Sequence, residues 1–339
     1  STVNTQPNDS TLAIRNSQST GYDLYQILLG DIEDQLEDQL IIIGDGPLVS
    51  FPFQALPTTE EGGGFLGLER KITTNVSLRM QQLMESVEID PKREQLLGFA
   101  PTFNGPLEIA QRGAMTDLEV SALQNNQDEL TAISTMFPGQ KHLGYSATRE
   151  NFFQSAEDYS VLHLATHAKA NIKNGRISYL VLVDEEAQPE PLYAAELANL
   201  SLNAEMVVLS ACETASGSSH HVEGTIGLTR SFAAAGARSI ISSLWPVDDA
   251  ATAEIMTDLY RGLDNGLEKD AALQMAQAAY RERHEGTEKA HPYYWAAFNL
   301  IGSNEAIALL PSWRYQWYWL ALGLLGLLVI TRFFFKGRR

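Results

Sequence analysis

The sequence predicts an α/β protein with a mostly parallel sheet and helices on both faces. Five short apolar runs lack the alternation of a half-exposed strand, and stretches of helical periodicity lie between and after them. Strands buried on both faces and separated by helices are typical of parallel sheets. We therefore expect functional groups at the carboxyl ends of these strands, where such sheets bind their ligands. The five runs are residues 96–100, 161–165, 179–183, 206–210 and 238–244.

The N-terminal region has a different character. Residues 1–20 are polar and rich in turn formers without periodicity, which indicates a flexible tail. Residues 22–38 have the apolar spacing of an amphipathic helix. The apolar run 40–43 closes with Gly-Asp-Gly, which is typical of a buried strand followed by a turn. Further helices are expected at residues 117–137, 148–156, 192–199, 223–236, 250–264 and 268–284.

Composition narrows the possible functions. The chain has 24 basic and 42 acidic side chains, a formal net charge of −18, so nucleic acid is a poor partner and a basic protein or peptide is a better one. The single cysteine excludes an internal disulfide framework and a cysteine-based zinc site. No phosphate-binding motif or G-x-S-x-G elbow is present, and His220 and His221 lack a spaced third ligand. We expect neither a cofactor nor a metal ion.

The C-terminal segment is predicted to cross a membrane once. Residues 315–331 carry no charge and would reach about 26 Å as a helix. With the residues that follow, the stretch is long enough for a bilayer, so we expect a transmembrane helix over 313–335 and a basic tail over 336–339. The basic residues after the span would place the C-terminus in the cytoplasm and the rest of the chain outside, whereas a tail-anchored protein would have the reverse orientation. An interfacial aromatic belt would consist of Trp313, Trp317, Tyr318 and Trp319.

The single cysteine lies where a parallel sheet presents functional groups. Cys212 follows the apolar run 206–209, and His167 ends another run, Val-Leu-His-Leu-Ala-Thr-His. If the two strands are neighbours, their carboxyl ends bring the thiol and the imidazole together. The imidazole could then take the thiol proton and later protonate a leaving amine, as the base of a cysteine nucleophile does. The backbone N–H groups of Cys212 and Ala168 could face one developing oxyanion.

The same residues also have a purely structural interpretation. Free cysteine is among the most buried residue types, and His163 or His167 could be hydrogen-bonded core residues. The chain would then be an α/β binding domain with an inert thiol. Spacing alone leaves both interpretations open.

Four blocks of the sequence resemble the CHAT family, a caspase-like peptidase domain that is related to separase and often found beside TPR repeats. The blocks are residues 163–168, 209–217, 223–249 and 291–302, in the family's order. The resemblance covers about residues 22–303. It implies a caspase-like fold of two halves, a degenerate pseudo-protease half over 21–145 and a catalytic half over 146–305.

The resemblance also implies the roles of individual residues. The family's catalytic dyad falls on His167 and Cys212. In caspase-like enzymes the oxyanion donors are the amides of the cysteine and of the residue after the histidine. That residue is usually glycine and is Ala168 here, which restricts the backbone and narrows the approach.

A candidate S1 pocket follows from the same resemblance. In separase-like relatives an acid just after Leu-Trp binds a basic P1 side chain, and the matching stretch here is Leu-Trp-Pro-Val-Asp-Asp. Asp248 or Asp249 could bind Arg or Lys by a charge-assisted hydrogen bond, or could cap the helix expected next. Glu213 could add negative potential, and Trp245 could wall the pocket or pack in the core.

These observations predict a membrane-anchored cysteine endopeptidase that cleaves protein substrates, with a basic residue as the candidate P1. The alternative is a catalytically silent caspase-like module that acts as a scaffold or signalling unit at the membrane. The resemblance further implies an upstream TPR or sensor region, or a separate partner. It also implies a role in bacterial stress, immunity or programmed cell death.

Overall fold

The chain divides into two units, residues 1–307 and 308–339, and the structure, a computed structural model, describes parts of the first. Across these described ranges, no helix has the length and apolar character that crossing a bilayer requires. The transmembrane helix predicted over 313–335 and its basic tail lie outside them. The described residues are 9–60, 62–89, 94–103, 107–111, 114–118, 123, 125–169, 175–210 and 222–307.

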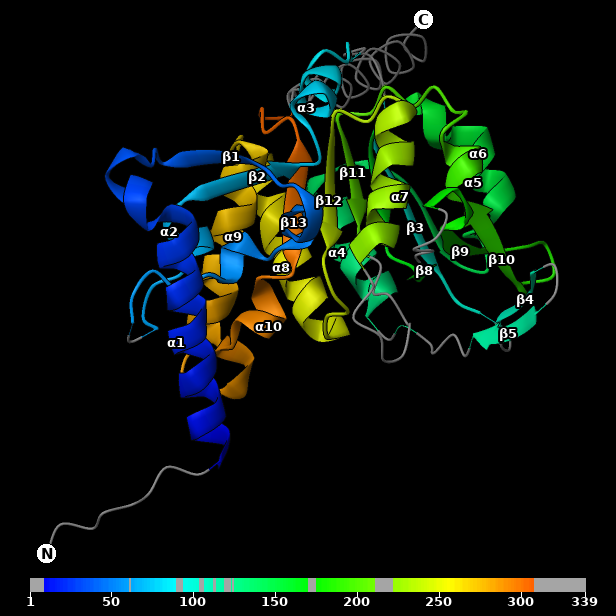
Figure 1. Cartoon of the computed structure of the whole chain (residues 1–339). Helices are drawn as coiled ribbons and strands as arrows, with labels where there is room; N and C mark the ends of the chain where they lie inside the picture. The colour runs from blue at the N-terminus through cyan, green and yellow to red at the C-terminus, as the bar shows by residue number, and fades with distance from the viewer. Residues whose placement is uncertain are drawn as a thin grey trace, which may run out of the picture. The chain divides into compact units, whose positions relative to one another are not determined.

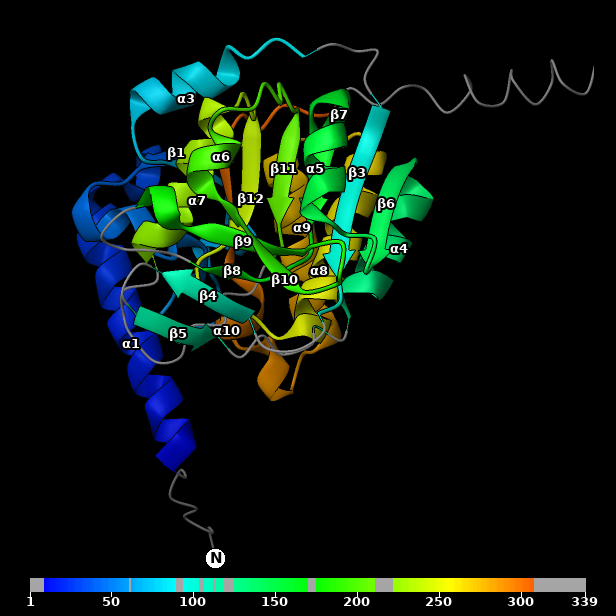
Figure 2. The ribbon, with the colours of Figure 1, turned by 90° about the vertical axis from the view of Figure 1, so that its right-hand side faces the viewer.

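The core of the fold is an eight-stranded mixed sheet (Figures 1 and 2). Five neighbouring strands, β12, β11, β7, β3 and β6, run parallel, which confirms the predicted mostly parallel sheet. The strand β13 lies antiparallel to β12, and β2 and β1 follow parallel to β13. In spatial order the strands are β1 (Gln39–Ile43), β2 (Lys71–Asn75), β13 (Phe298–Gly302), β12 (Ser239–Ser243), β11 (Met206–Leu209), β7 (Tyr159–Leu164), β3 (Glu94–Pro101) and β6 (Gly139–Gly144).

Helices cover both faces of this sheet, as predicted (Figures 1 and 2). One face is covered by α4 (Asn126–Met136), α8 (Asp249–Asp264) and α9 (Lys269–Arg283). The other is covered by α5 (Arg149–Ser155), α6 (Ala194–Leu197) and α7 (Val222–Ala234). Further helices are α2 (Leu66–Glu69), α3 (Leu78–Glu85) and α10 (Pro292–Trp295).

Strand alternation sends side chains of β7 into both helical layers. Leu162 and Leu164 belong to a buried apolar cluster that includes Phe152 of α5 and Phe232 of α7. His163, between the two leucines, points to the opposite layer. Burying each of these aromatic or aliphatic side chains stabilises the fold by roughly 1.5–3 kcal/mol. The apolar side of the strand therefore fixes its register, and the polar side chain is held on the other face.

The N-terminal tail predicted over residues 1–20 is wrong from residue 9 onward, because α1 extends over Asp9–Leu29. Its C-terminal part packs Tyr25 into a cluster with Phe53 and Leu56. Once this turn is fixed, helix propagates toward the N-terminus at little cost, since nucleation is the costly step and no proline follows Pro7 in this stretch.

Two antiparallel sheets were not predicted. The hairpin β4 (Leu107–Gln111) and β5 (Ala114–Leu118) precedes α4, so the helix expected from residue 117 begins at Asn126 instead. The run 179–183 forms β9 (Tyr179–Val183), but it pairs antiparallel with β8 (Ala168–Lys169) and β10 (Pro189–Tyr193) outside the central sheet. All its residues are buried, which gives it the apolar pattern of a central strand.

The two halves predicted by resemblance form one continuous sheet. Strand β3 of the first half pairs with β7 of the second, and β2 of the first half pairs with β13 of the second. Residues 1–307 accordingly cluster as one compact unit. The two predicted halves are thus joined in one unit, and the assignment of a degenerate half and a catalytic half stays a prediction.

Candidate active site

The candidate site lies at the edge where β3, β7, β11 and β12 end. Strands β7 and β11 are direct parallel neighbours, and Leu164 lies opposite Leu209. His167 is the third residue after Leu164, and Cys212 is the third residue after Leu209. Ser210 is the last residue of this strand end that the structure describes, and Cys212 lies outside the described residues. The prediction that these two strands are neighbours in the sheet is confirmed.

His167 is held in place by its own backbone and by an aromatic ring. Its carbonyl oxygen accepts a hydrogen bond from the Val181 N–H at 2.9 Å, and the Thr166 hydroxyl donates to the Val181 carbonyl. The imidazole is fully buried, with its ring centroid 5.8 Å from that of Phe103 at the end of β3. The small sheet β8–β9–β10 thus anchors the loop that carries His167.

The amide of Ala168 points away from the small sheet. Hydrogen-bonded and non-hydrogen-bonded pairs alternate along an antiparallel ladder. Since His167 and Val181 form a hydrogen-bonded pair, the next pair, Ala168 and Leu180, is a non-hydrogen-bonded one. The N–H of Ala168 is therefore directed to the side of β8 that faces away from β9. Ala168 is not among the described non-glycine residues with positive φ, so its backbone conformation does not require glycine.

Asn126, which the sequence did not single out, joins two strand ends at the same edge. Its side-chain amide donates to the carbonyl oxygens of Pro101 at 3.0 Å and Ala165 at 3.2 Å. Asn126 is buried at the start of α4. The amide thereby fixes the end of β3 to the residue that precedes the Thr166–His167 turn. An asparagine directly before an acidic helix start was the only signal in the sequence.

The candidate S1 residues lie after β12. Asp248 is the N-cap of α8, because its carboxylate accepts from the Ala251 N–H at 3.1 Å, so the capping interpretation is confirmed for this residue. Its side chain is 44% exposed and lies 3.9 Å from the Lys289 ammonium. Asp249 is the first residue of α8 and is half-buried. Glu213 lies outside the described residues.

Trp245 is half-buried instead of lying in the core. Its indole N–H donates to the Tyr293 carbonyl at 2.8 Å, and the two rings stack with centroids 6.3 Å apart. The Tyr293 hydroxyl donates in return to the Pro246 carbonyl at 3.1 Å. Tyr293 is 49% exposed, so this stack forms an aromatic ledge beside the end of β12. Tyr293 occurs in the last of the four sequence blocks but was not singled out from the sequence.

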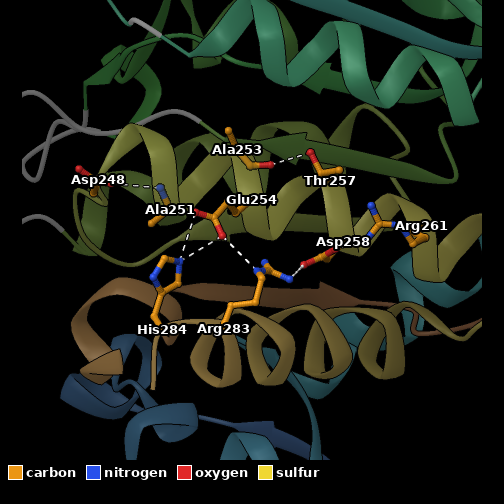
Figure 3. Close-up of polar contacts among 9 residues, drawn as sticks. All are labelled: Asp248, Ala251, Ala253, Glu254, Thr257, Asp258, Arg261, Arg283 and His284. Atoms are coloured by element: carbon orange, nitrogen blue, oxygen red, sulfur yellow. Dashed lines mark hydrogen bonds and ion pairs between the residues drawn. The ribbon is translucent and has the colours of Figure 1, made fainter. Parts of the chain in front are cut away.

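An ion-pair cluster between α8 and α9 supports this region (Figure 3). Glu254 accepts from Arg283 at 3.2 Å and lies 3.1 Å from His284, and Asp258 lies 2.6 Å from Arg283. Arg261 also pairs with Asp258. Because α8 follows the Trp245 loop and α9 leads to Tyr293, the cluster holds together the two elements that carry the ledge.

A cavity of about 880 Å³ lies beside this ledge. Phe65, Arg281, Tyr293 and Tyr294 contribute to its walls, and the lining also includes three acidic residues, Glu282, Glu285 and Glu288. The Arg281 guanidinium lies over the Phe65 ring, 5.4 Å from its centroid. His167 does not line this cavity. Over the described stretches, no group of three or more His, Cys, Asp or Glu side chains could hold a metal ion.

Comparisons with solved structures show a caspase-like fold. Gingipain R, an arginine-specific cysteine proteinase, superimposes with a TM-score of 0.50 at 14% identity, covering 87% of this chain and 68% of that chain. The separase of a Saccharomyces cerevisiae separase–securin complex gives a TM-score of 0.47 at 12% identity over 76% of this chain and 15% of that chain. At 14% identity the likeness to gingipain R concerns the fold alone.

Comparisons of sequence find relatives that carry repeats. Tetratricopeptide repeat protein 28 of Homo sapiens is 26% identical over 83% of this chain and 13% of its own length. The Mus musculus protein of the same name is 28% identical over 52% of this chain and 8% of its own length. The chain thus spans about a tenth of the length of these relatives. The CHAT domain model matches residues 18–303, and the chain therefore belongs to the CHAT family.

Proposed function

We propose that this protein is a cysteine endopeptidase in which Cys212 is the nucleophile and His167 the general base and acid. One observation carries the proposal: both residues follow, at the same distance along the chain, a pair of residues that lie opposite each other on neighbouring parallel strands. Chain connectivity keeps the Cys212 backbone within about 7 Å of Ser210, since each residue spans at most about 3.6 Å. A thiol and an imidazole at adjacent strand ends form a nucleophile with its base.

The reaction proceeds by acyl transfer. His167 accepts the thiol proton, and the sulfur attacks the carbonyl carbon of the scissile peptide bond. The tetrahedral intermediate carries its negative charge on the former carbonyl oxygen. When it collapses, the C–N bond breaks, His167 protonates the leaving amine, and a thioester remains. Water then attacks the thioester with His167 as base, which releases a carboxylic acid and restores the thiol.

The amide of Ala168 supports an oxyanion site. Its N–H points away from the small sheet, and it follows His167 directly. Together with the N–H of Cys212 it would donate to the developing oxyanion. Removing one such donor from an oxyanion hole generally lowers kcat about 100- to 1000-fold. Ala168 offers the same donor as glycine, with a methyl group that limits the approach.

A basic P1 residue is the substrate preference that the surface supports. Asp249 at the start of α8 and the acidic net charge of −18 favour a cationic side chain, and Glu213 follows the nucleophile directly. Asp248 is already engaged as an N-cap, so it would add to the negative electrostatic potential of the pocket and not bind the substrate directly. The Trp245–Tyr293 ledge offers an aromatic wall next to these acids. Gingipain R, which shares the fold, is arginine-specific.

The full protein would combine this domain with further parts. The tetratricopeptide relatives support an associated repeat region that delivers or restrains substrates. The uncharged segment 315–331 supports a membrane anchor, with the catalytic domain on the extracytoplasmic side as the excess of basic residues after it favours. The second candidate function is a catalytically silent scaffold at the membrane. Membership of the CHAT family and the caspase-like fold are equally compatible with this function.

Cleavage of a pooled peptide library by the full chain tests the proposal. We expect cleavage after Arg or Lys that is lost in Cys212→Ala and in His167→Ala. Loss in both variants with another residue at P1 would retain the dyad and remove the acidic S1 pocket. Where the library is not cleaved, labelling of the single thiol by a peptide with a thiol-reactive warhead separates an enzyme awaiting activation from a scaffold. A scaffold labels slowly and retains its function in Cys212→Ala.

A further inference from the structure

A buried polar network connects the strand that leads to His167 with the strand that leads to Cys212. His163 is fully buried in β7, and its Nε2 lies 2.7 Å from Glu129 of α4 and 3.3 Å from the Ser210 hydroxyl. Its Nδ1 lies 3.1 Å from the hydroxyl of Tyr260 in α8. Glu129 is 4% exposed and Ser210 is 5% exposed. The acyl-transfer chemistry proposed above uses none of these groups.

Both ring nitrogen atoms of His163 have a buried polar partner. The Tyr260 hydroxyl faces Nδ1, and the Glu129 carboxylate faces Nε2. Burial, helped by the Glu129 carboxylate, raises the pKa of the Tyr260 hydroxyl well above its ordinary value, so this hydroxyl keeps its proton. The imidazole is therefore engaged from two different helices.

Although serine, histidine and glutamate meet here, they do not form a catalytic triad. In a triad the carboxylate orients one ring nitrogen, and the other nitrogen accepts the serine proton. In this network both Glu129 and Ser210 approach the same nitrogen, Nε2, and Nδ1 faces Tyr260. The arrangement is therefore not that of a triad, because no second nitrogen faces Ser210. The network must serve another purpose than nucleophile activation.

The network lies where it can fix the relative position of the two strand ends that lead to His167 and Cys212. Ser210 is the second residue before Cys212, and His163 is the fourth before His167. The Ser210–His163 contact therefore bridges the two strand ends beside the proposed dyad, and Glu129 and Tyr260 lock the imidazole from two different helices. A buried polar cluster seldom stabilises more than apolar residues of the same volume would, so specificity of arrangement is the reason to keep one.

We propose that His163 is a positioning residue that, through Ser210, sets the distance between Cys212 and His167. The inference rests on the proposed function, since it concerns the geometry of that dyad. A displacement of about 1 Å in a reacting group can lower the rate about 100-fold. Loss of the Ser210–His163 contact should therefore lower kcat about 10- to 100-fold. KM should stay within about twofold, because His163 and Ser210 are buried and neither lines the described cavity.

The test compares two buried serines on adjacent strands. Ser210→Ala removes the hydroxyl that contacts His163, and Ser239→Ala is the matched control. Ser239 is fully buried at the opposite end of β12 and donates to the Glu205 carbonyl at 2.8 Å. Each variant loses one buried hydroxyl, so their losses of thermal stability should be similar. His163→Gln, which keeps a donor toward Glu129, should lose less activity than His163→Leu, and all variants are studied as the full chain.

Two readouts decide the outcome. The first is kcat and KM on the peptide that the wild-type chain cleaves. The second is the pH profile of iodoacetamide alkylation, which reports Cys212 alone because the chain has one cysteine. We expect Ser210→Ala to lower kcat at unchanged KM and to shift the alkylation profile toward that of a free thiol, while Ser239→Ala changes neither. Equal behaviour of the two serine variants would overturn the inference.

The wild-type chain separates this inference from the function on which it rests. A wild-type thiol with an ordinary alkylation profile and no peptidase activity would overturn both. A wild-type enzyme with a perturbed thiol, whose profile and kcat survive Ser210→Ala and His163→Leu, would overturn the positioning role and leave the dyad intact. A Ser210→Ala variant that fails to fold is replaced by Tyr260→Phe, which removes the hydroxyl that faces Nδ1 and keeps the aromatic ring.

Discussion

Glu205 and Lys269 form a buried ion pair whose two halves should contribute unequally to stability. The Lys269 ammonium is fully buried and lies 3.0 Å from one Glu205 oxygen, and the Arg238 guanidinium lies 3.5 Å from the other. Burial lowers the pKa of Lys269, and the Glu205 carboxylate opposes this shift. Removing the carboxylate leaves two cations without it, whereas removing the ammonium leaves the carboxylate paired with Arg238.

The expected magnitudes follow from this asymmetry. Glu205→Gln should lower the free energy of unfolding by about 3–5 kcal/mol, the usual cost of leaving a buried charge unpaired. Lys269→Met keeps the side-chain volume and removes the buried charge, so its cost should stay within about 1 kcal/mol. The double variant should recover most of the loss caused by Glu205→Gln, since the two sites are in contact and not additive.

Urea denaturation of the full chain measures these differences, with the unfolding free energy obtained from the midpoint and slope of each transition. A smaller loss for Glu205→Gln than for Lys269→Met would refute the reasoning. So would a double variant that is less stable than either single one. Glu205 directly precedes β11, so the pair also fixes the start of the strand whose other end leads to Cys212.

Three further predictions concern separate features. Gly302→Ala should cost at least 2 kcal/mol more than Gly266→Ala in urea unfolding. Both glycines have positive φ, but only at Gly302 would a Cβ meet a backbone atom, the Arg238 carbonyl oxygen at 2.6 Å, and equal costs would exclude a steric origin. Asn126→Ala should cost about 2–3 kcal/mol in the same assay, because two carbonyl oxygens lose their donor, and a loss under 0.5 kcal/mol would refute the bridge. Burial lowers the pKa of His142 below 6.5, so between the folded pKa and 6.5 the unfolded chain binds more protons than the folded chain. The free energy of unfolding should therefore fall as the pH drops through this range, by at most about 1.4 kcal/mol per pH unit. His142→Gln should flatten this slope, and an unchanged slope would contradict the assignment to His142.

The strands that flank the candidate site could be predicted because they are continuous apolar runs. Strands β7 and β11 are buried along almost their whole length, and such runs have few alternatives in a folded chain. Strand β2 was missed for the opposite reason. Thr73, Thr74 and Asn75 are buried although they are polar. Their hydrogen-bond partners include Gln81 and Asn299, the second far away in sequence, so no local pattern reveals the strand.

The same distinction applies to the site. His167 could be predicted because it ends an apolar run and matches a family motif. The network around His163 could not, because its partners Glu129 and Tyr260 lie 34 and 97 residues away on two different helices. An isolated histidine in a strand pattern carries no sign of what faces it. The aromatic ledge of Trp245 and Tyr293 depends in the same way on two loops that only the fold brings together.

The pH dependence of alkylation of the single cysteine tests the dyad most directly. We predict that the wild-type chain reacts with iodoacetamide along a profile whose inflection lies well below 8.5, the ordinary thiol value, because the His167 imidazole shares the thiol proton. His167→Ala should return the inflection to about 8.5. An inflection near 8.5 in both proteins would contradict the account, since Cys212 would then be a thiol without a base.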